Sequence, residues 1–422
     1  MSEPLAGAAP RGTAVTVRGE PPGRSPGDLA EQAAGVLWDN RAELVATLET
    51  FGTRTAAVDE ISNSVAALRG ASAELATHRP RTVGGLGVFL PSNNVLYSYV
   101  LFGLIPLLYS SHITMRPSQR VASQSQRIHR IITSDAAFRG TLPIEFVSLT
   151  QRQFIARCAE TDVVVFNGRP ANALAVGERL PDRTALLAFG SGPNPVVVGA
   201  DADVKTVADD VVRTRLYNSG QDCLCPDIVF AHDDVADDLL TAMGEAVANV
   251  PVGPLADPTT TVAPLSYPDA VEQAAAFLSD HPGRTVTGGR VDLATGLVTP
   301  TVIDLPWDPS FCPPEFFSPV ICVMRYSSGE DIVKWLDSPS ERRRGMYVSV
   351  YGESAVRGPR AGSSVVLRET TALDAENGNE PLGGYGPEAS HVRVGASLTA
   401  RPLLLSAELG PAHAETVRAL HG

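Results

Sequence analysis

Lysine is almost missing from this sequence: Lys205 and Lys334 are the only two among 34 lysine and arginine residues. Both lie in segments with the apolar spacing of an amphipathic helix, which argues against Schiff-base chemistry through lysine. Cysteine and histidine are also scarce, with five and eight residues in a chain of 422. Five cysteines without a Cys-x-x-Cys pair are too few for a disulfide framework, and the scattered histidines offer no zinc ligand set. We therefore expect no metal site.

Excess positive charge and long apolar runs are missing as well. The net charge is −13 and the pI is about 5.1, which argues against a nucleic-acid partner or an anionic membrane surface. One apolar stretch, residues 95–109, is interrupted by Gly103 and Pro106 and is shorter than the roughly 20 residues of a membrane span. The N-terminus lacks the basic start and apolar run of a signal peptide. We expect a cytoplasmic protein with no membrane span.

Hydrophobic periodicity organises the rest of the chain. Residues 1–27 are rich in Pro, Gly, Ala and Arg without a period and are expected to form a mobile tail. Residues 27–77 show helical spacing, and β-rich runs then alternate with helical stretches such as 94–109, 204–216 and 235–248. This alternation predicts an α/β fold with largely parallel sheets. The predicted strands are 87–90, 113–116, 146–148, 163–166, 185–189, 196–198, 228–231, 320–325, 347–351 and 365–368.

The segment with the clearest chemistry is Asn-Ser-Gly-Gln-Asp-Cys-Leu-Cys-Pro at 218–226. It follows a predicted helix and precedes a predicted strand, so Gly220 is suited to end the helix and turn the chain. Cys223 is then expected near the mouth of a sheet, where ligands bind in α/β folds and where a thiolate is placed to attack a carbonyl carbon. By itself the Cys-x-Cys pattern fits a buried, inert cysteine equally well.

Six segments in chain order give this sequence a resemblance to the aldehyde dehydrogenase superfamily. The nucleophile motif Asn-x-Gly-Gln-x-Cys is matched at 218–223. The other matches are Pro-Ser-Asn at 91–93, Arg-Pro-Ser-Gln at 116–119, Phe-Asn-Gly-Arg at 166–169, Pro-Glu-Phe-Phe-Ser-Pro-Val at 314–320 and Pro-Leu-Gly-Gly-Tyr-Gly at 381–386. Together they span roughly residues 87–386.

The resemblance implies a catalytic role for Cys223 and Asn93. The Cys223 thiolate would attack a carbonyl, and the oxygen that becomes negative would be met by the Asn93 amide and the Cys223 backbone N–H. The cofactor would be NADP or NAD, which supplies the redox chemistry. The simpler alternatives are a turn or N-cap role for Asn93 and a loop carboxylate at Glu315. The matching motifs imply that Arg116, Ser118 and Gln119 lie at the adenosine ribose and that Gly168 and Arg169 lie beside the pyrophosphate. They also imply that Glu315 anchors the nicotinamide ribose, that Glu315 and Phe317 hold the nicotinamide, and that Gly190 binds the cofactor.

The departures from the family pattern bear on which reaction is catalysed. Oxidative members carry Glu-Leu-Gly-Gly-Lys-x-Pro, whose Glu activates the water that hydrolyses the thioester. The matching segment at 189–195 reads Phe-Gly-Ser-Gly-Pro-Asn-Pro, so Phe189 stands in place of that Glu. A general base typically speeds such a reaction about 10²–10⁴-fold, so hydrolysis of the acyl-cysteine by water should be slow without one. Exchange with a thiol needs less help, because a thiol yields its thiolate far more readily than water yields hydroxide. Gln119 and Arg116 replace Glu and Lys at the ribose, which makes NADP(H) plausible.

The Gly-Ser-Gly-Pro-Asn-Pro string at 190–195 also resembles the Gly-Pro-Gly-Asn-type loops of acylating family members, which reduce acyl-thioesters to aldehydes. The departures and this resemblance predict NAD(P)H-dependent reduction of an acyl-thioester, acyl-CoA or carrier-bound, to an aldehyde through a Cys223 acyl-enzyme. The first alternative is NAD(P)⁺-dependent oxidation of an aldehyde to a carboxylic acid. The second is an inactive family member that acts as a binding or scaffold protein. In each enzymatic case the partner is a small-molecule aldehyde or acyl-thioester.

The same resemblance implies a Rossmann-type cofactor domain and an α/β catalytic domain. We place the NAD(P)-binding domain at 28–194, joined again by 387–422, and the catalytic domain at 195–386. A homodimer or homotetramer is expected. The strand-like run 401–406 would pair with another subunit or pack on its own domain as a helix or loop.

Overall fold

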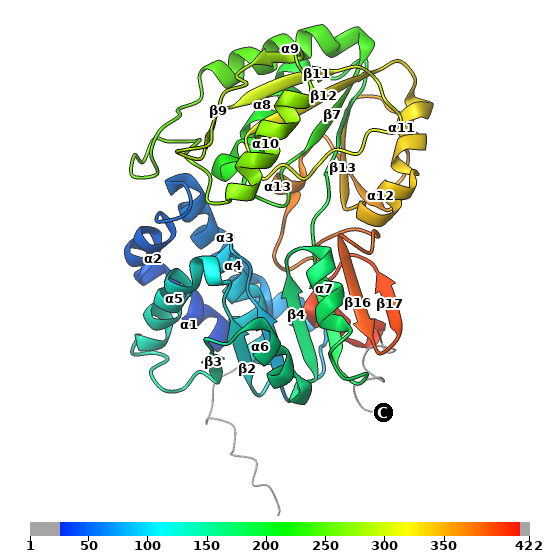
Figure 1. Ribbon diagram of the computed structural model, residues 1–422. Helices are drawn as coiled ribbons and strands as arrows, with labels where there is room; N and C mark the ends of the chain where they lie inside the picture. Colours follow the sequence, from blue (N-terminus) through cyan, green and yellow to red (C-terminus); the bar gives the residue numbers. More distant parts are fainter. Residues whose placement is uncertain (1–25, 414–422) are drawn as a thin grey trace, which may run out of the picture.

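The structure, a computed structural model, describes residues 26–413 and contains two sheets with helices around them (Figure 1). The first sheet has seven strands in the order β17-β16-β5-β4-β1-β2-β3. Its five strands from the first half of the chain are parallel, and β16 and β17 add antiparallel strands at one edge. The strands are β1 (Leu86–Phe89), β2 (Ile113–Arg116), β3 (Ile144–Phe146), β4 (Val163–Asn167), β5 (Ala185–Phe189), β16 (Ser390–Val394) and β17 (Ser397–Ala400).

The second sheet has eight strands in the order β14-β15-β13-β6-β7-β12-β11-β8, and its central pairs are parallel. The strands are β6 (Val196–Val198), β7 (Ile228–His232), β8 (Thr285–Thr287), β11 (Thr301–Leu305), β12 (Val320–Tyr326), β13 (Tyr347–Tyr351), β14 (Arg360–Ala361) and β15 (Ser364–Arg368). A separate hairpin consists of β9 (Val291–Asp292) and β10 (Leu297–Val298). The predicted α/β class with largely parallel sheets is confirmed.

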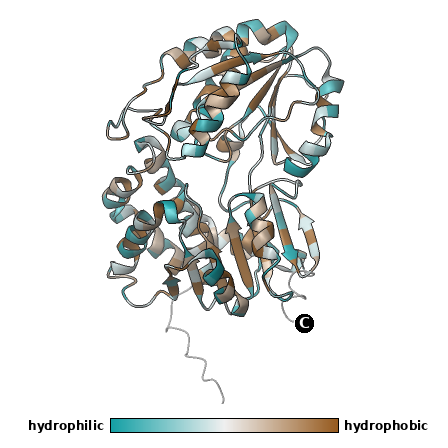
Figure 2. Ribbon diagram, in the orientation of Figure 1, coloured by the Kyte–Doolittle hydropathy of each residue, from teal (hydrophilic) through white to brown (hydrophobic). Residues whose placement is uncertain are grey.

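Helices cover both sheets, and Figure 2 shows largely hydrophobic central strands and helices that carry both hydrophilic and hydrophobic residues. The helices around the first sheet are α1 (Pro26–Asp39), α2 (Arg41–Leu48), α3 (Arg54–His78), α4 (Val95–Tyr99), α5 (Ala122–Ser134), α6 (Gln151–Arg157), α7 (Pro170–Gly177) and α14 (Leu405–Glu408). The later part of the chain forms α8 (Val204–Arg215), α9 (Asp233–Ala248), α10 (Pro268–Asp280), α11 (Gly329–Leu336), α12 (Pro339–Arg344) and α13 (Ala372–Ala375). Of the tail predicted over 1–27, residues 26 and 27 instead begin α1, and the rest lies outside the described residues.

The apolar stretch 95–109 is helical but not one regular helix. It consists of α4, a π-helical turn η1 (Val100–Leu104) and a 3₁₀ turn η2 (Pro106–Leu108). Pro106 has no N–H for a continuing α-helix, and a Cβ on Gly103 would lie 2.2 Å from Met115 Cε, so this segment packs tightly on β2. Among residues 26–413, no helix is long and apolar enough to cross a bilayer.

The prediction of a strand-like run at 401–406 is wrong. Only Leu403 forms a β-bridge, to Leu382, and α14 follows at once. An ion pair between Arg401 and Glu408 at 2.7 Å closes this segment into a compact turn, while Leu403 and Leu405 are buried in the core of the first sheet. The alternative of a loop and helix packed on its own domain therefore describes this segment.

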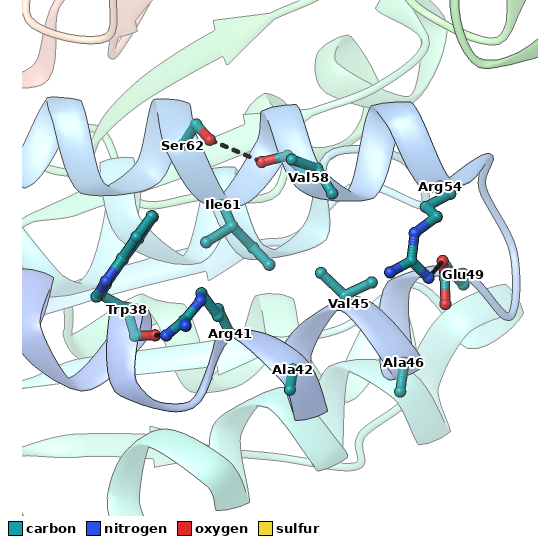
Figure 3. Close-up of a pocket in the computed structure, with 10 residues that line it drawn as sticks. All are labelled: Trp38, Arg41, Ala42, Val45, Ala46, Glu49, Arg54, Val58, Ile61 and Ser62. Carbon is teal, nitrogen blue, oxygen red and sulfur yellow. Dashed lines mark hydrogen bonds and ion pairs between the residues drawn. The ribbon is translucent and has the colours of Figure 1, made fainter. Parts of the chain in front are cut away.

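A surface groove of about 500 Å³ lies between α1, α2 and α3 (Figure 3). Its apolar floor contains Val45 and Ile61, Trp38 lies at one end, and the Glu49–Arg54 ion pair lies at the other. No cysteine, histidine or unpaired acidic side chain lines it. The groove is therefore separate from the chemistry of the Cys223 segment.

Candidate active site

The Cys223 segment is a sharp turn between α8 and β7. Asp203 caps the start of α8 by accepting from the backbone N–H groups of Lys205 and Thr206. After α8, Asn218 and Ser219 adopt left-handed backbone angles (φ 48° and 62°), and Gly220 follows at φ 81°. A Cβ on Gly220 would lie 2.5 Å from the Ser318 carbonyl, so only glycine fits this close approach.

The position of Cys223 differs from the sequence expectation in one respect. Cys223 precedes β7, so it lies near the amino end of its own sheet rather than at a carboxyl-end mouth. The carboxyl ends that it approaches belong to the first sheet, because residues just after β1 contact its neighbour Asp222. Sequence periodicity does not show which sheet a loop will face, since that depends on how the two sheets pack.

Backbone and side-chain hydrogen bonds fix the nucleophile loop. Asn194 Nδ2 donates to the Cys223 carbonyl at 2.7 Å and to the Cys225 carbonyl at 3.4 Å. Asp222 Oδ1 accepts from the Leu224 N–H at 2.9 Å. Asn194 and Asp222 are both buried, so bulk water does not compete for the hydrogen bonds that hold the loop. Sequence reasoning missed Asn194.

Two successive asparagines follow β1 and behave differently. Asn94 Nδ2 donates to Asp222 Oδ2 at 2.8 Å and therefore joins the first-sheet part of the chain to the nucleophile loop. Asn93 is half-buried, and its side chain makes no hydrogen bond to residues 26–413. The amide of Asn93 therefore stays available to a substrate oxygen, and its oxyanion role stays a prediction. Asn94 and Asp222 were missed, although an acid beside the motif cysteine is visible in the sequence.

Helix α4, which follows these asparagines, is anchored by a buried acid from α3. Glu60 Oε1 accepts from the backbone N–H groups of Leu96 at 2.6 Å and of Tyr97 at 3.1 Å. These are first-turn donors without partners in their own helix, and a carboxylate is favoured at that end of the dipole. Burial raises the pKa of Glu60 to about 7. The helical spacing of residues 27–77 did not indicate that Glu60 would anchor another helix.

Electrostatics keep the Cys223 thiol protonated in this arrangement. Burial is the largest cause that raises the pKa of Cys223 well above its ordinary value, and the negative charges of Asp222 and Glu315 raise it further. The thiolate is the reactive form. Removal of one of these negative charges should therefore increase the reactivity of the thiol.

We expect Asp222→Asn to speed alkylation of Cys223 by iodoacetamide at pH 8 on the order of tenfold, which corresponds to a pKa lowered by about one unit. The measurement is the mass-resolved alkylation rate in a Cys312→Ser background, because Cys312 is exposed. Asn94→Ala is the matched control, since it breaks the 2.8 Å contact but leaves the charge of Asp222. Equal acceleration in both variants would mean that the loop has loosened and would contradict the electrostatic explanation.

The segment before β12 supplies two of the predicted cofactor residues. The Oε1 atom of Glu315 is buried and has no hydrogen-bond partner among the described residues. Burial, followed by the charge of Asp227, raises the pKa of Glu315 to about 7. A ribose hydroxyl would supply the missing donor, so this residue fits a nucleotide. Phe317 has a strained φ of 35°, and its ring lies 5.6 Å from the ring of Tyr267.

The other predicted cofactor residues lie at the carboxyl ends of β2, β4 and β5. Arg116 ends β2 and donates from Nε to the Leu149 carbonyl at 2.9 Å, while Ser118 is half-buried and Gln119 is exposed. Because these strands are parallel and adjacent through β1, their loops meet at one edge of the sheet, as in nucleotide-binding sites.

The remaining predicted cofactor residues, Gly168, Arg169 and Gly190, have distinct local roles. Gly168 has φ 145° at the end of β4, and Arg169 forms an ion pair with Asp269 of α10. Gly190 follows β5, and a Cβ there would lie 2.0 Å from the Glu388 carbonyl. Gly190 is therefore explained by packing as well, and its cofactor contact stays a prediction.

The structure thus gathers the predicted residues into one region. Cys223 and Glu315 are close enough for their charges to interact, and Asn94 joins the Asn93 segment to the same loop. Arg169 reaches across to the second-sheet part of the chain through Asp269. Among residues 26–413, no group of three or more His, Cys, Asp or Glu residues could hold a metal ion.

Comparison with known proteins decides the family. The model of the aldehyde dehydrogenase family matches residues 29–366. The chain belongs to the aldehyde dehydrogenase family. This match confirms the predicted superfamily and, with it, the predicted class of NAD(P)-dependent oxidoreductase. The subtype is not decided by it.

Two relatives show how distant the named members of the aldehyde dehydrogenase family are. The chain is 26% identical over 348 residues to "Aldehyde dehydrogenase, mitochondrial" of Leishmania tarentolae, covering 79% of this chain and 66% of that protein. It is 25% identical over 395 residues to the N-succinylglutamate 5-semialdehyde dehydrogenase of Chromohalobacter salexigens, covering 86% and 75%. The chain therefore spans about two thirds to three quarters of the length of these relatives.

Solved structures agree on the fold. Glyceraldehyde-3-phosphate dehydrogenase GapN from Methanocaldococcus jannaschii, complexed with NADP, superposes with a TM-score of 0.75 at 18% identity, covering 87% of this chain and 88% of that one. PnpE in complex with nicotinamide adenine dinucleotide gives a TM-score of 0.76 at 17% identity, covering 88% and 85%. The aldehyde dehydrogenase-like fold is confirmed.

Proposed function

We propose that this aldehyde dehydrogenase family member reduces an acyl-thioester to an aldehyde with NADPH or NADH, and that Cys223 carries the acyl group. The observation that carries the proposal is the absence of a general base from the segment that supplies it in oxidative members. Phe189 is buried at the end of β5, with its ring 5.1 Å from that of Phe102. No Asp or Glu occurs from residue 185 to residue 198. Aligning the family's Glu motif a few residues earlier or later therefore still places no carboxylate at the position of the base.

The carboxylates nearest Cys223 are poorly placed to replace that base. Both oxygens of Asp222 already accept hydrogen bonds, from Asn94 and from the Leu224 N–H. Glu315 belongs to the predicted nicotinamide ribose site. Without an activated water, hydrolysis of the acyl-cysteine is slow, by about 10²–10⁴-fold for a missing base, whereas exchange with a thiol continues.

The residues support the following chemistry. Cys223 Sγ bonds to the thioester carbonyl carbon, the bond from that carbon to the carrier sulfur breaks, and the carrier leaves as its thiol after taking a proton. When bound, the reduced nicotinamide supplies the hydride that the acyl-cysteine needs. The Asn93 amide and the Cys223 backbone N–H donate to the oxygen as it becomes negative. The aldehyde then leaves as the bond to Sγ breaks, and Sγ, whose original proton left with the carrier thiol, takes up a proton from solvent.

Several features support a nicotinamide cofactor held by the first sheet and by Glu315. The neighbours that carry NADP and NAD share the fold, and the orphan Oε1 of Glu315 needs a donor. Gln119 is exposed and uncharged at the predicted adenosine ribose, so it would not repel a 2′-phosphate, which favours NADP(H). On this proposal, residues 28–194 with 387–422 form the cofactor domain and residues 195–386 form the catalytic domain.

Oxidation of an aldehyde to an acid is the second candidate. It is favoured by the names of the relatives, which are an aldehyde dehydrogenase and a semialdehyde dehydrogenase. It requires a water activated by a group other than the usual Glu. A homodimer or homotetramer and a cytoplasmic location stay predictions.

The deciding experiment follows nicotinamide absorbance with purified protein, a panel of acyl-CoAs and NADPH or NADH. A parallel series uses aldehydes with NADP⁺ or NAD⁺, with and without CoA, and Cys223→Ala is the blank. We expect acyl-CoA reduction, and aldehyde oxidation only in the presence of CoA. Aldehyde oxidation that is indifferent to CoA would overturn the proposal in favour of the second candidate. Inactivity in every combination, together with no cofactor binding, would favour a scaffold role.

A further inference from the structure

Two arginines from the first-sheet part of the chain meet one acid of α10. Asp269 lies in the first turn of α10 and pairs with Arg169 through Oδ2 and with Arg120 through Oδ1, the latter at 3.8 Å. Arg120 also donates to the Ser266 carbonyl at 2.8 Å and lies over the Tyr267 ring at 4.3 Å. We call Asp269, Arg120 and Arg169 the Asp269 clasp.

The Asp269 clasp lies along the predicted path of the cofactor. Arg120 directly follows the segment 116–119, which is predicted to hold the adenosine ribose, and Arg169 directly follows Gly168 in the predicted pyrophosphate loop. On the other side, Tyr267 packs against Phe317, which is predicted to face the nicotinamide. The clasp therefore bridges the two parts of the chain between the adenosine end and the nicotinamide end of the site.

Arg120 and Arg169 form an anion-binding site that the carboxylate of Asp269 occupies. Arg169 donates to the Asp269 carboxylate and Arg120 adds a second positive charge at 3.8 Å, and guanidinium groups that hold a carboxylate also bind phosphate. The three side chains are 38%, 46% and 75% exposed for Arg120, Asp269 and Arg169. Ion pairs this exposed contribute little to stability, so a phosphate that carries more charge is able to displace the carboxylate.

We propose that Asp269 is an internal competitor for the phosphates of the cofactor. In the free protein it holds Arg120 and Arg169 against α10, and binding of NADP⁺ transfers Arg169 to the pyrophosphate and Arg120 to the 2′-phosphate. Asp269 thereby lowers cofactor affinity, and Arg120 determines the preference for NADP over NAD. The inference concerns cofactor binding alone and does not depend on the direction of the reaction.

Each member of the clasp has its own expected effect on the dissociation constant. Asp269→Asn removes the competing charge and should tighten NADP⁺ binding about five- to tenfold, and NAD⁺ binding by less. Arg120→Gln should weaken NADP⁺ binding about tenfold and leave NAD⁺ binding within about twofold. Arg169→Gln should weaken the binding of both nucleotides by similar factors, because both contain the pyrophosphate.

The test is isothermal titration calorimetry of the full-length protein with NADP⁺ and NAD⁺, without substrate. Glu272→Gln is the matched control, because it removes the same charge from an exposed position on the same helix. An Asp269→Asn affinity that equals that of Glu272→Gln, or that is weaker than wild type, would overturn the competition. Equal losses for both nucleotides in Arg120→Gln would overturn its assignment to the 2′-phosphate. If the expected pattern appears but no acyl-CoA is reduced, the proposed reaction fails and the Asp269 clasp stands.

Discussion

Replacing Cys223 by alanine is expected to abolish turnover of acyl-CoAs and aldehydes, by on the order of 10⁴-fold or more, while cofactor binding is unchanged. The reason is that every step of the proposed chemistry passes through a covalent bond to Sγ. Mass spectrometry of the wild type with an acyl-CoA and no reduced cofactor should show an acyl adduct on the peptide that contains Cys223. The variant should show none.

Cys225 provides the matched control, because it lies two residues away and is buried. Its Sγ–H donates to the Thr214 carbonyl at 3.1 Å, and burial raises the pKa of its thiol. Cys225 differs from the partly exposed Cys223 because it is 1% exposed and its thiol is committed to the Thr214 carbonyl, so no substrate carbon reaches it. Cys225→Ala should therefore retain activity within about tenfold. If both alanine variants lose activity to the same degree, the loss reflects the shape of the loop, and the nucleophile assignment fails.

Replacing Arg215 by methionine is expected to destabilise the protein by about 3–5 kcal/mol, because it leaves a buried acid without its partner. Arg215 and Asp227 are 1% and 2% exposed, and they pair at 2.6 Å. Arg215 also donates to the Ser318 carbonyl at 2.7 Å and to the Gly220 carbonyl at 3.2 Å. It therefore joins the turn before Cys223 to the loop that contains Glu315.

Urea unfolding at pH 8 measures this effect. Burial raises the pKa of Asp227 to about 6 despite its arginine partner, so this group holds its proton longer in the folded state. Its contribution to stability therefore falls as the pH rises through the window between its unfolded pKa near 4 and about 6. At pH 8 it is ionised, and the cost of losing Arg215 is fully expressed.

Arg213→Met is the control for Arg215. Arg213 lies on the same helix, is 54% exposed and pairs with Asp374 and Asp210 at the surface, so its loss should cost no more than about 1 kcal/mol. The double variant Arg215→Met with Asp227→Asn should recover part of the stability, since the uncompensated charge is removed. A loss in Arg215→Met no larger than that in Arg213→Met would show that the buried pair does not hold the loop.

Local sequence predicted most of the parallel strands and several helices, because their signals are periodic and short in range. The strand predicted at 146–148 instead lies at Ile144–Phe146 (β3), and the antiparallel strands β16 and β17 were not predicted. The run predicted at 228–231 is β7, and the helix predicted at 204–216 is α8, which buries Val207, Val211 and Val212. The run at 401–406 failed because its leucines are buried by a turn and a short helix. Alternation alone does not distinguish these environments.

The sequence by itself determined the family, the α/β class and the candidate residues, because motifs and periodicity are properties of neighbouring positions. Only the tertiary structure decided which groups hold the Cys223 loop and the helix that packs beside it. Glu60, Asn94 and Asn194 come from three separate segments, and Asp269 meets two arginines about 100 and 149 residues earlier in the chain. Such contacts arise where the carboxyl edge of one sheet packs against loops of the other. How strongly a buried charge interacts with its neighbours depends on that packing, and a local sequence pattern carries no information about it.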